Sequence, residues 1–585
     1  MWSDIILRAL FGPSYVPHKI QKLLEYRFVF AVILGFLLDY QMLGIFLASQ
    51  FFELRSTLNS VIMTLQRSMF SVYTMAMMVI IRVFVAGYGL ILCHMHYAYP
   101  RCNGSKMKRI INDFPTHFSL LFSILLVAFA SSWLYASYAD PVEGYYLQIL
   151  GCISGIFYFK TQHGFTLQRF PLPIVRLGLL KSIQQMWWPL LERSGREAFG
   201  TTIIFTMLFW PYMENIFNGL YLILTEPGIL LRGWLVNTLI LAKLRMVWEL
   251  YGLIMQRQLP LSIDFRCQDI IEDICLRNII KEWIKTLICR IKQQPVDEKP
   301  RYTHSLSIST ALDSTHIYGF KVLAARDFYA EMSGSLWTEL VAIEDVKNTS
   351  AYWEELRKVL YKIINDFLVK MDSCLDTAPR AQISDLLKRQ TGIRSLVKPK
   401  EVAQGSLRKY CRAPQIEIQI QPTHLCICNI VGYLRELVHF YSGLFFPSYL
   451  VFPNQFAFLF AIDKLAKLNH VLQCGEPLVW ILQGLVCICA RSLREDSHGI
   501  VQKDLSWVFE VLIKVEGKLI AAAEVPVQSD RENGKLCPSH KLLKLATNRC
   551  LFKMLKTFGP HLNYIVNDQT LREELKSRMK ILNQF

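Results

Sequence analysis

Histidine and cysteine side chains are the first candidates for chemistry in this chain, because clusters of them bind metals or supply nucleophiles. The tightest cluster is Cys93–His94–Met95–His96, with Cys102 nearby. Its two histidines stand two residues apart, and that spacing does not place them on one helix face. The 13 histidines are otherwise dispersed, none in an HxxxH or HExxH pattern, and no Gly-rich phosphate loop occurs. We therefore expect neither a metal centre nor catalysis, and no cofactor.

The 15 cysteines do not form a secreted disulfide framework, because they are scattered and no CxxC pair is present. The two closest pairs are Cys426 with Cys428 and Cys487 with Cys489. Both pairs lie in apolar sequence, where thiols act as small core side chains. We expect these cysteines to be structural.

The composition indicates a membrane protein with basic flanks. Of its 585 residues, 52% are hydrophobic and 19% are charged, against about 25% charged in soluble domains. The mean hydropathy is +0.27, yet the formal charge is +17. In a membrane protein, such an excess of lysine and arginine holds orientation and contacts anionic headgroups. We expect no direct binding of nucleic acid from the charge alone.

Apolar segments of spanning length predict a polytopic N-terminal half. The fold class we expect is all-α, with about six transmembrane helices followed by a mainly helical cytosolic C-terminal region. Residues 1–27 are the predicted cytosolic tail and 28–256 the membrane domain. The predicted spans lie near 28–48, 70–92, 118–138, 145–159, 202–224 and 229–252.

Charge on the connections predicts the orientation of these spans. Arginine and lysine collect in the N-terminal tail and after the second, fourth and sixth spans. The turns "ADPVEG" (139–144) and "TEPG" (225–228) carry acids and no cations. Positive charge on every second connection marks the cytosolic side. We therefore expect both termini in the cytosol and very little lumenal mass.

Between the fourth and fifth spans, residues 172–190 predict a helix that lies in the membrane interface. Arg176 and Lys181 stand opposite the apolar positions, and the segment ends in Trp187 and Trp188. Outward cations and aromatics at headgroup level are typical of interfacial helices. A long cytosolic loop is the alternative.

Charged residues inside the predicted spans are the candidates for a transport function. They are Asp39, Arg82, Glu214, Lys243 and Arg245. Intramembrane charges often mark a substrate path, so a transporter or channel is an alternative to a structural protein. The spans show no internal repeat and few helix breaks, which a transport path would favour. Asp39 and Arg82 could instead pair between helices.

The second half has the pattern of a soluble helical protein. We divide it into an amphipathic connection (257–291), a linker (292–317), a helical block (318–393), a second linker (394–422) and a C-terminal helical block (423–585). Residues 440–462 are strongly apolar, but Pro447 and Pro453 divide them into pieces too short to cross a membrane.

Two short motifs stand out in this half. "GFKVLAARDFYAEMSGS" (319–335) contains Leu323, Ala324 and Asp327. "LVWILQGLVCICARSLREDSHGIVQKDL" (478–505) combines one apolar helix face with the positions Glu495, Asp496, Gly499, Val501 and Gln502. Gly499 can adopt the left-handed conformation that ends a helix, and Asp504 or an earlier acid can serve the amides of the next helix. We expect these positions to be structural.

With this layout, the two motifs resemble the NDC (nuclear-division-cycle) transmembrane nucleoporin family. The resemblance extends over essentially the whole chain. It implies a structural integral-membrane nucleoporin that anchors the nuclear pore complex in the nuclear envelope and supports pore assembly. It implies docking of soluble scaffold nucleoporins, an Aladin-type WD-repeat protein and a membrane-binding nucleoporin with an RRM-like domain, on the cytosolic half. Protein and mRNA transport would depend on it indirectly, and no enzymatic activity is implied.

Overall fold

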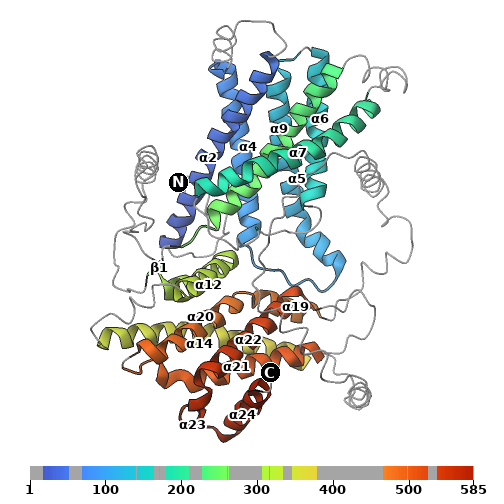
Figure 1. The fold of residues 1–585 in the computed structure, drawn as a ribbon. Helices are drawn as coiled ribbons and strands as arrows, with labels where there is room; N and C mark the ends of the chain where they lie inside the picture. The colour runs from blue at the N-terminus through green and yellow to red at the C-terminus, as the bar shows by residue number, and fades with distance from the viewer. Residues whose placement is uncertain are drawn as a thin grey trace, which may run out of the picture.

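The computed structural model describes residues 18–51, 69–139, 141–163, 170, 179–209, 227–259, 261–262, 306–314, 317–333, 346–377, 465–496, 498–524 and 536–583. These residues are mostly helical, as expected, and form two tiers. Long helices from the first half make an upright bundle, and helices from the second half make a block beneath it (Figure 1). Helix α12 lies at the boundary between the tiers.

The bundle contains six described helices. They are α2 (His18–Phe51), α4 (Val72–Tyr97), α5 (Lys106–Ala136), α6 (Pro141–Tyr158), α7 (Leu179–Phe209) and α9 (Pro227–Met255). Helix α9 contacts all five of the others, while α5 with α6 and α7 with α9 form the most extensive pairs. The centre of the bundle is therefore α9, which explains why Asn237, Lys243 and Arg245 on this helix are buried.

Three bundle segments are long and apolar enough to cross a membrane: Ile20–Ser49, Val72–Tyr97 and Ile111–Ala136. The number among the described residues rises to four if the bent pair Ala466–Cys474 and Leu478–Arg494 counts as one span. Helices α6 and α9 cover the predicted fourth and sixth spans. Charged side chains along α9, including Arg232, Lys243 and Arg245, lower its hydropathy.

Two element boundaries differ from the sequence prediction. Helix α2 begins at His18, inside the predicted tail, and the guanidinium of Arg27 on this helix is buried and hydrogen-bonded to the carbonyl oxygen of Met255. Helix α7 runs without interruption through Pro189, and it joins part of the predicted interfacial helix to the start of the predicted fifth span. Residues 210–226, the remainder of that span with Glu214, lie outside the described residues.

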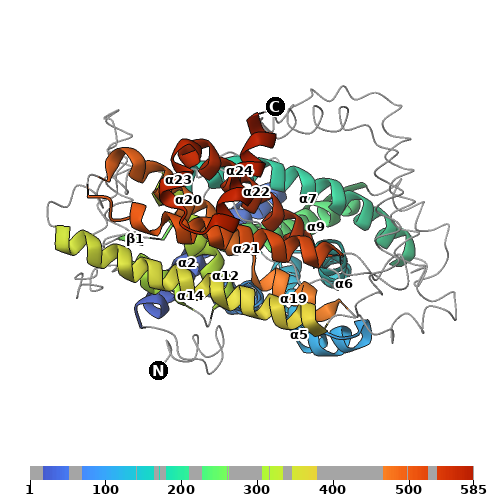
Figure 2. The ribbon, with the colours of Figure 1, turned by 90° about the horizontal axis from the view of Figure 1, so that it is seen from below.

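The lower block is a layered helical unit. Its elements are α11 (Ile308–Leu312), α12 (Tyr318–Ser333), α14 (Val346–Thr377), α19 (Ala466–Cys474), α20 (Leu478–Glu495), α21 (Leu505–Glu524), α22 (Pro538–Phe558), α23 (Leu562–Ile565) and α24 (Gln569–Asn583). Helix α20 packs between α12 and α22, and α14 packs on α21 (Figure 2). The predicted linkers and the apolar stretch 440–462 lie largely or wholly outside the described residues.

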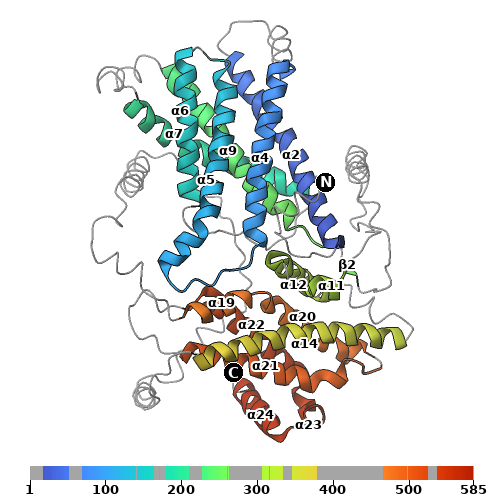
Figure 3. The same cartoon turned by 180° about the vertical axis from the view of Figure 1, so that it is seen from behind.

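A short parallel ladder ties the end of the bundle to the start of the block. Strand β1 (Leu261–Ser262) pairs with β2 (Leu306–Ser307), and β2 leads directly into α11. Seen from behind, α11 and α12 lie directly under the lower end of α2, and α19 lies below the connection between α4 and α5 (Figure 3). The chain thus returns to the base of the membrane bundle before it builds the block.

Candidate functional site at the junction of the two tiers

The C-terminal end of α9 is capped by arginine side chains from two other helices. Arg27 of α2 donates hydrogen bonds to the carbonyl oxygens of Met255, at 3.0 Å, and Gln258, at 2.9 Å. Arg326 of α12 donates to the carbonyl oxygen of Gln256 at 2.9 Å. The last carbonyls of a helix lack partners within it and carry partial negative charge, so cations are stabilising there. The junction satisfies these groups with buried guanidinium ions.

The motif residue Asp327 supplies the negative charge at this junction, and we call Arg27, Arg326 and Asp327 together the joint. Its carboxylate accepts a hydrogen bond from the backbone N–H of Leu259 at 2.7 Å and pairs with Arg326 at 3.1 Å. The side chain of Asp327 is fully buried. A buried carboxylate is stable only when it is paired and hydrogen-bonded, and here both conditions hold. Leu323 and Ala324 lie on the same helix and are also buried.

The N-terminal end of α12 packs directly on the end of α4. A Cβ atom on Gly319 would lie 2.6 Å from the carbonyl oxygen of His96, so only glycine fits. The ring of Tyr318 meets that of Tyr99 edge to face, with centroids 5.5 Å apart. The Tyr318 hydroxyl donates to the carbonyl oxygen of Gln473 at 2.6 Å and lies 2.9 Å from a carboxylate oxygen of Glu476. Tyr318 thus links α12 to the segment that follows α4 and to α19.

The second motif forms the turn that follows α20. Asp496 accepts a hydrogen bond from the N–H of Val501 at 2.9 Å, and Gly499 has φ +64°. Gln502 donates to the carbonyl oxygen of Ser492 at 3.2 Å. Val501 is buried, whereas of Glu495 only the backbone, at the last turn of α20, is described. The turn therefore directs the chain from α20 into α21.

Asp504 connects this turn to α14. Its carboxylate accepts a hydrogen bond from the indole N–H of Trp353 at 2.7 Å and pairs with Arg357 at 2.5 Å. The earlier acid, Asp496, binds the amide of Val501 within this turn, four residues before α21 begins, and not an amide of α21 itself. Asp504 fixes α14 against the turn.

Inside the bundle, one carboxylate stands between two cations. Asp39 of α2 pairs with Arg82 of α4 at 3.1 Å and with Lys243 of α9 at 3.8 Å. All three side chains are buried, and Lys243 also donates to the Ser131 hydroxyl at 3.2 Å. Arg82 donates further hydrogen bonds to the backbone carbonyls of Ala31 and Val32. Asp39, through its pairs with Arg82 and Lys243, thus ties α2, α4 and α9 together.

Another predicted membrane charge, Arg245, is also paired. It contacts Glu197 of α7 and donates to the Ser194 hydroxyl at 3.1 Å. About two turns earlier on α9, Asn237 donates to the hydroxyls of Thr201 and Thr202. These polar contacts hold the middle of α7 to the middle of α9, as polar groups do between membrane helices.

The predicted interfacial positions fall on the first turns of α7. Lys181 is exposed, Trp187 is half-buried, and Trp188 is 68% exposed. Arg176 lies outside the described residues. The arrangement leaves a large aromatic side chain on the outer surface at one end of the bundle.

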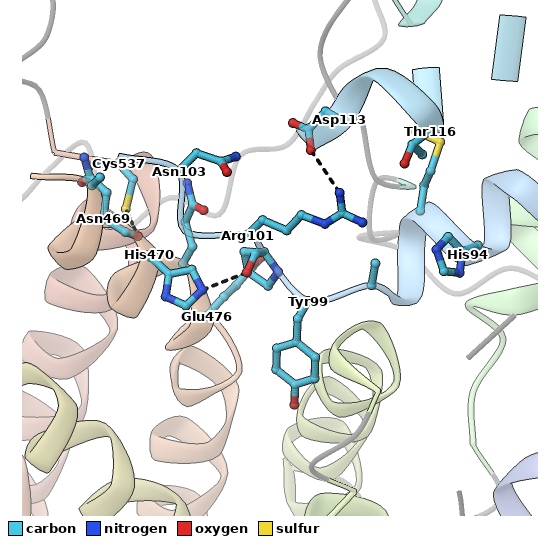
Figure 4. A pocket seen from close by; sticks show the side chains of 15 residues that line it. His94, Tyr99, Arg101, Asn103, Asp113, Thr116, Asn469, His470, Glu476 and Cys537 are labelled. Carbon is cyan, nitrogen blue, oxygen red and sulfur yellow. Dashed lines mark hydrogen bonds and ion pairs between the residues drawn. The ribbon is translucent and has the colours of Figure 1, made fainter. Parts of the chain in front are cut away.

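A cavity of about 500 Å³ opens beside the joint, between the α4–α5 connection and α19 (Figure 4). Arg101, Asp113 and Thr116 line one side, and His470, Asn469 and Glu476 line the other. Arg101 donates to the carbonyl oxygen of Asn112 at 2.6 Å and lies 3.8 Å from the Asp113 carboxylate. His470 donates to the carbonyl oxygen of Pro100 at 2.8 Å and thereby closes the loop against α19.

The histidine and cysteine cluster of the sequence is divided by this arrangement. His94 lines the cavity, whereas His96 is buried against Tyr97 and Phe170, with ring centroids 5.1 and 5.0 Å away. Over the ranges that the structure describes, no group of three or more histidine, cysteine or acidic side chains could hold a metal ion.

The sequence analysis does not single out the arginines of the joint or the cavity. Arg27 lies in the predicted cytosolic tail, and Arg326 stands next to the motif residue Asp327. The available signal was this Arg-Asp pair in the middle of an apolar helical segment, because charges that become buried must be paired or hydrogen-bonded.

These features define a structural class: a multi-pass membrane protein with a helical block joined to its helix ends by buried charges. A sequence model described as "Nucleoporin protein Ndc1-Nup" matches residues 292–576. The chain is 23% identical to nucleoporin Ndc1 of Drosophila pseudoobscura pseudoobscura, over 95% of this chain and 96% of that protein. It is 22% identical to nucleoporin Ndc1 of Drosophila melanogaster, over 91% and 93%.

The resemblance drawn from the sequence is confirmed, because the family model matches residues 292–576 and both relatives match more than nine tenths of the chain. The Ndc1-Nup nucleoporin family is a structural component of the nuclear pore and not an enzyme. This similarity, together with the apolar helices, supports a location in the nuclear envelope and pore membrane. It also implies contact with other nucleoporins and with the membrane.

Proposed function

We propose that this protein anchors the nuclear pore complex in the nuclear envelope and holds soluble nucleoporins on its lower helical block. The observation that carries the proposal is the buried joint between Arg27, Arg326 and Asp327 at the end of α9. A joint made of buried charges resists separation, because removal of one partner leaves another charge buried alone. Load on the block is therefore passed directly to the membrane helices.

The proposed topology has about six spans and both termini on the cytosolic or pore side. The support is the alternation of basic and acidic connections along the sequence, together with helices at or overlapping all six predicted positions. Little lumenal mass and an interfacial start to α7 suit a strongly curved membrane, since an amphipathic segment in the interface favours curvature.

The proposed partners are soluble scaffold nucleoporins, of which an Aladin-type WD-repeat protein and a membrane-binding nucleoporin with an RRM-like domain are implied by the family. The support in this chain is a set of large apolar side chains that are exposed on the lower block. These include Tyr361 and Val369 of α14, and Phe552 and Tyr564 near the C-terminus. Pore assembly, and indirectly protein and mRNA transport, would depend on these contacts.

A transport function is not favoured by the membrane charges. Asp39, Arg82 and Lys243 bind one another, and Arg245 binds Glu197. A transport path needs polar groups that face a substrate at the bilayer midplane. These side chains serve helix association instead.

Imaging of a tagged full-length chain beside a chain that ends after residue 259 tests the proposal. This truncation keeps both carbonyls that Arg27 binds. We expect punctate nuclear-rim signal for the full chain, overlapping a soluble pore component. The truncated chain should stay in the envelope, which controls for its folding, while the soluble component is displaced. Uniform reticular or plasma-membrane signal from the full chain would contradict the anchoring role.

A further inference from the structure

We propose that the cavity between the α4–α5 connection and α19 binds the headgroup of a zwitterionic phospholipid, one with a phosphate and a cationic amine. The inference rests on the placement of this end of the bundle at the membrane surface. His94 belongs to the last turn of the apolar helix α4, and Thr116 lies early in the apolar segment Ile111–Ala136. The cavity therefore lies at the height of lipid headgroups, not in the membrane interior.

The size of the cavity suits a headgroup better than an ion. About 500 Å³ lies within the range of pockets that hold small organic ligands, whereas a water molecule takes up about 30 Å³. The polar lining side chains come from two different tiers of the molecule. A ligand here would contact both the membrane bundle and the block.

The lining charges favour a ligand with both signs of charge. Arg101 stands on the α5 side of the cavity, and Glu476 stands on the α19 side (Figure 4). The guanidinium of Arg101 is anchored by the Asn112 carbonyl and is 51% exposed, so it can contact a phosphate. A simple anion would meet Asp113 and Glu476 as well, and a simple cation would meet Arg101.

The amine of the headgroup fits the corner between Glu476 and Tyr99. The Glu476 carboxylate lies within hydrogen-bond distance of the Tyr318 hydroxyl, and a carboxylate can accept further hydrogen bonds. The Tyr99 ring packs against Tyr318 in the same corner. An aromatic face next to a carboxylate is a common site for an ammonium or quaternary ammonium group.

An apolar stripe on α5 marks the face of this helix that contacts the acyl chains of the membrane, which places the cavity at the membrane surface and so favours a lipid over a free headgroup. Ile111, Phe114, Phe118 and Phe122 share one helix face, and each is more than half exposed. The rings of Phe114 and Phe118 stack with centroids 5.9 Å apart. The stripe lies on the side of α5 that faces away from Asp113 and Thr116, and it extends along the apolar segment.

Native mass spectrometry of the full-length chain in detergent tests the proposal with two competing short-chain lipids. These are dioctanoylphosphatidylcholine, which has the amine, and dioctanoylphosphatidylglycerol, which lacks it. We expect the wild-type chain to prefer the first by about tenfold, equivalent to about 1.4 kcal/mol. Glu476→Gln should abolish the preference, while Arg101→Gln should weaken the binding of both lipids. Equal binding of the two lipids to the wild-type chain would overturn the proposal.

A second variant, a control variant and a second ligand keep the test decisive. The preference is a ratio within one sample, so partial unfolding of a variant does not change it. Tyr99→Leu is the second variant and should reduce the preference. The double variant Glu510→Gln and Lys514→Gln, an exposed pair on α21, is the matched control and should keep the wild-type ratio. Glycerophosphocholine, which lacks acyl chains, distinguishes the source: binding as strong as that of the lipid would refute a membrane lipid as the ligand. None of these outcomes depends on nuclear-pore localisation.

Discussion

The carboxylate of Asp327 accepts a hydrogen bond from the backbone N–H of Leu259, 68 residues earlier in the chain, at 2.7 Å. Leu259 lies four residues beyond the end of the central membrane helix, and Asp327 lies on the helix that begins the lower block. This contact and the Arg326–Gln256 hydrogen bond connect the two tiers through fully or nearly fully buried charges. The position of the lower block relative to the membrane bundle is thereby restricted.

Replacement of Asp327 by alanine should destabilise the full chain by about 3–5 kcal/mol, because Arg326 would keep its charge in a buried place without its carboxylate. Thermal unfolding of the purified protein in detergent measures the effect. The control is Asp313→Asn, whose exposed pair with Lys362 should contribute less than about 1 kcal/mol. Equal melting temperatures for the two variants would show that the joint does not support the fold.

Removal of the Asp39 carboxylate should destabilise the bundle more than removal of the Lys243 cation. Asp39→Ala leaves Arg82 and Lys243 together in the bundle, and we expect loss of about 3 kcal/mol or more. Lys243→Met keeps the Asp39–Arg82 pair and should be close to neutral. Melting temperatures of the two variants in detergent provide the comparison. If Lys243→Met is the more damaging change, Lys243 has a role beyond this pairing.

Gly319→Ala should separate α12 from the end of α4, because the added Cβ would lie 2.6 Å from the His96 carbonyl oxygen. Overpacking of this kind costs about 1–3 kcal/mol. Gly517→Ala is the matched control, since nothing lies within 4 Å of its Cβ position inside α21. There we expect stabilisation of about 0.5–1 kcal/mol from helix propensity. Protease sensitivity of the junction at fixed temperature would rank the two variants in that order.

The start of α24 should become less stable in acid. Hydrogen bonds from the side chain and backbone N–H of Thr570 lower the pKa of Asp568 below its ordinary value. A carboxyl with a lowered folded-state pKa stabilises the structure above its unfolded-state pKa, and the contribution is lost as the pH falls through the folded-state pKa. Hydrogen exchange of α24 in the wild-type chain and in Asp568→Asn should therefore differ at neutral pH and converge in strong acid. A constant difference across this range would exclude the carboxylate as the cause.

The sequence by itself determined the kinds of secondary-structure elements and the protein family that the chain resembles. Apolar runs of spanning length predict helices wherever they occur, because a backbone in lipid must satisfy its own hydrogen bonds. The Leu-Ala and Asp motif was identified by its resemblance to the family alone. The Asp496–Gln502 turn also follows from local requirements, because a left-handed Gly499 and an acid that binds a nearby amide are satisfied by neighbouring residues.

Only the tertiary structure decided which distant charges meet. Asp39, Arg82 and Lys243 come from three helices, and Arg27 and Arg326 reach one helix end from two others. The spacing of residues along a chain cannot identify such partners, because the rotation and depth of each helix depend on the packing of all its neighbours. The cavity has the same origin: its walls belong to segments more than 350 residues apart, which meet only after both tiers have formed.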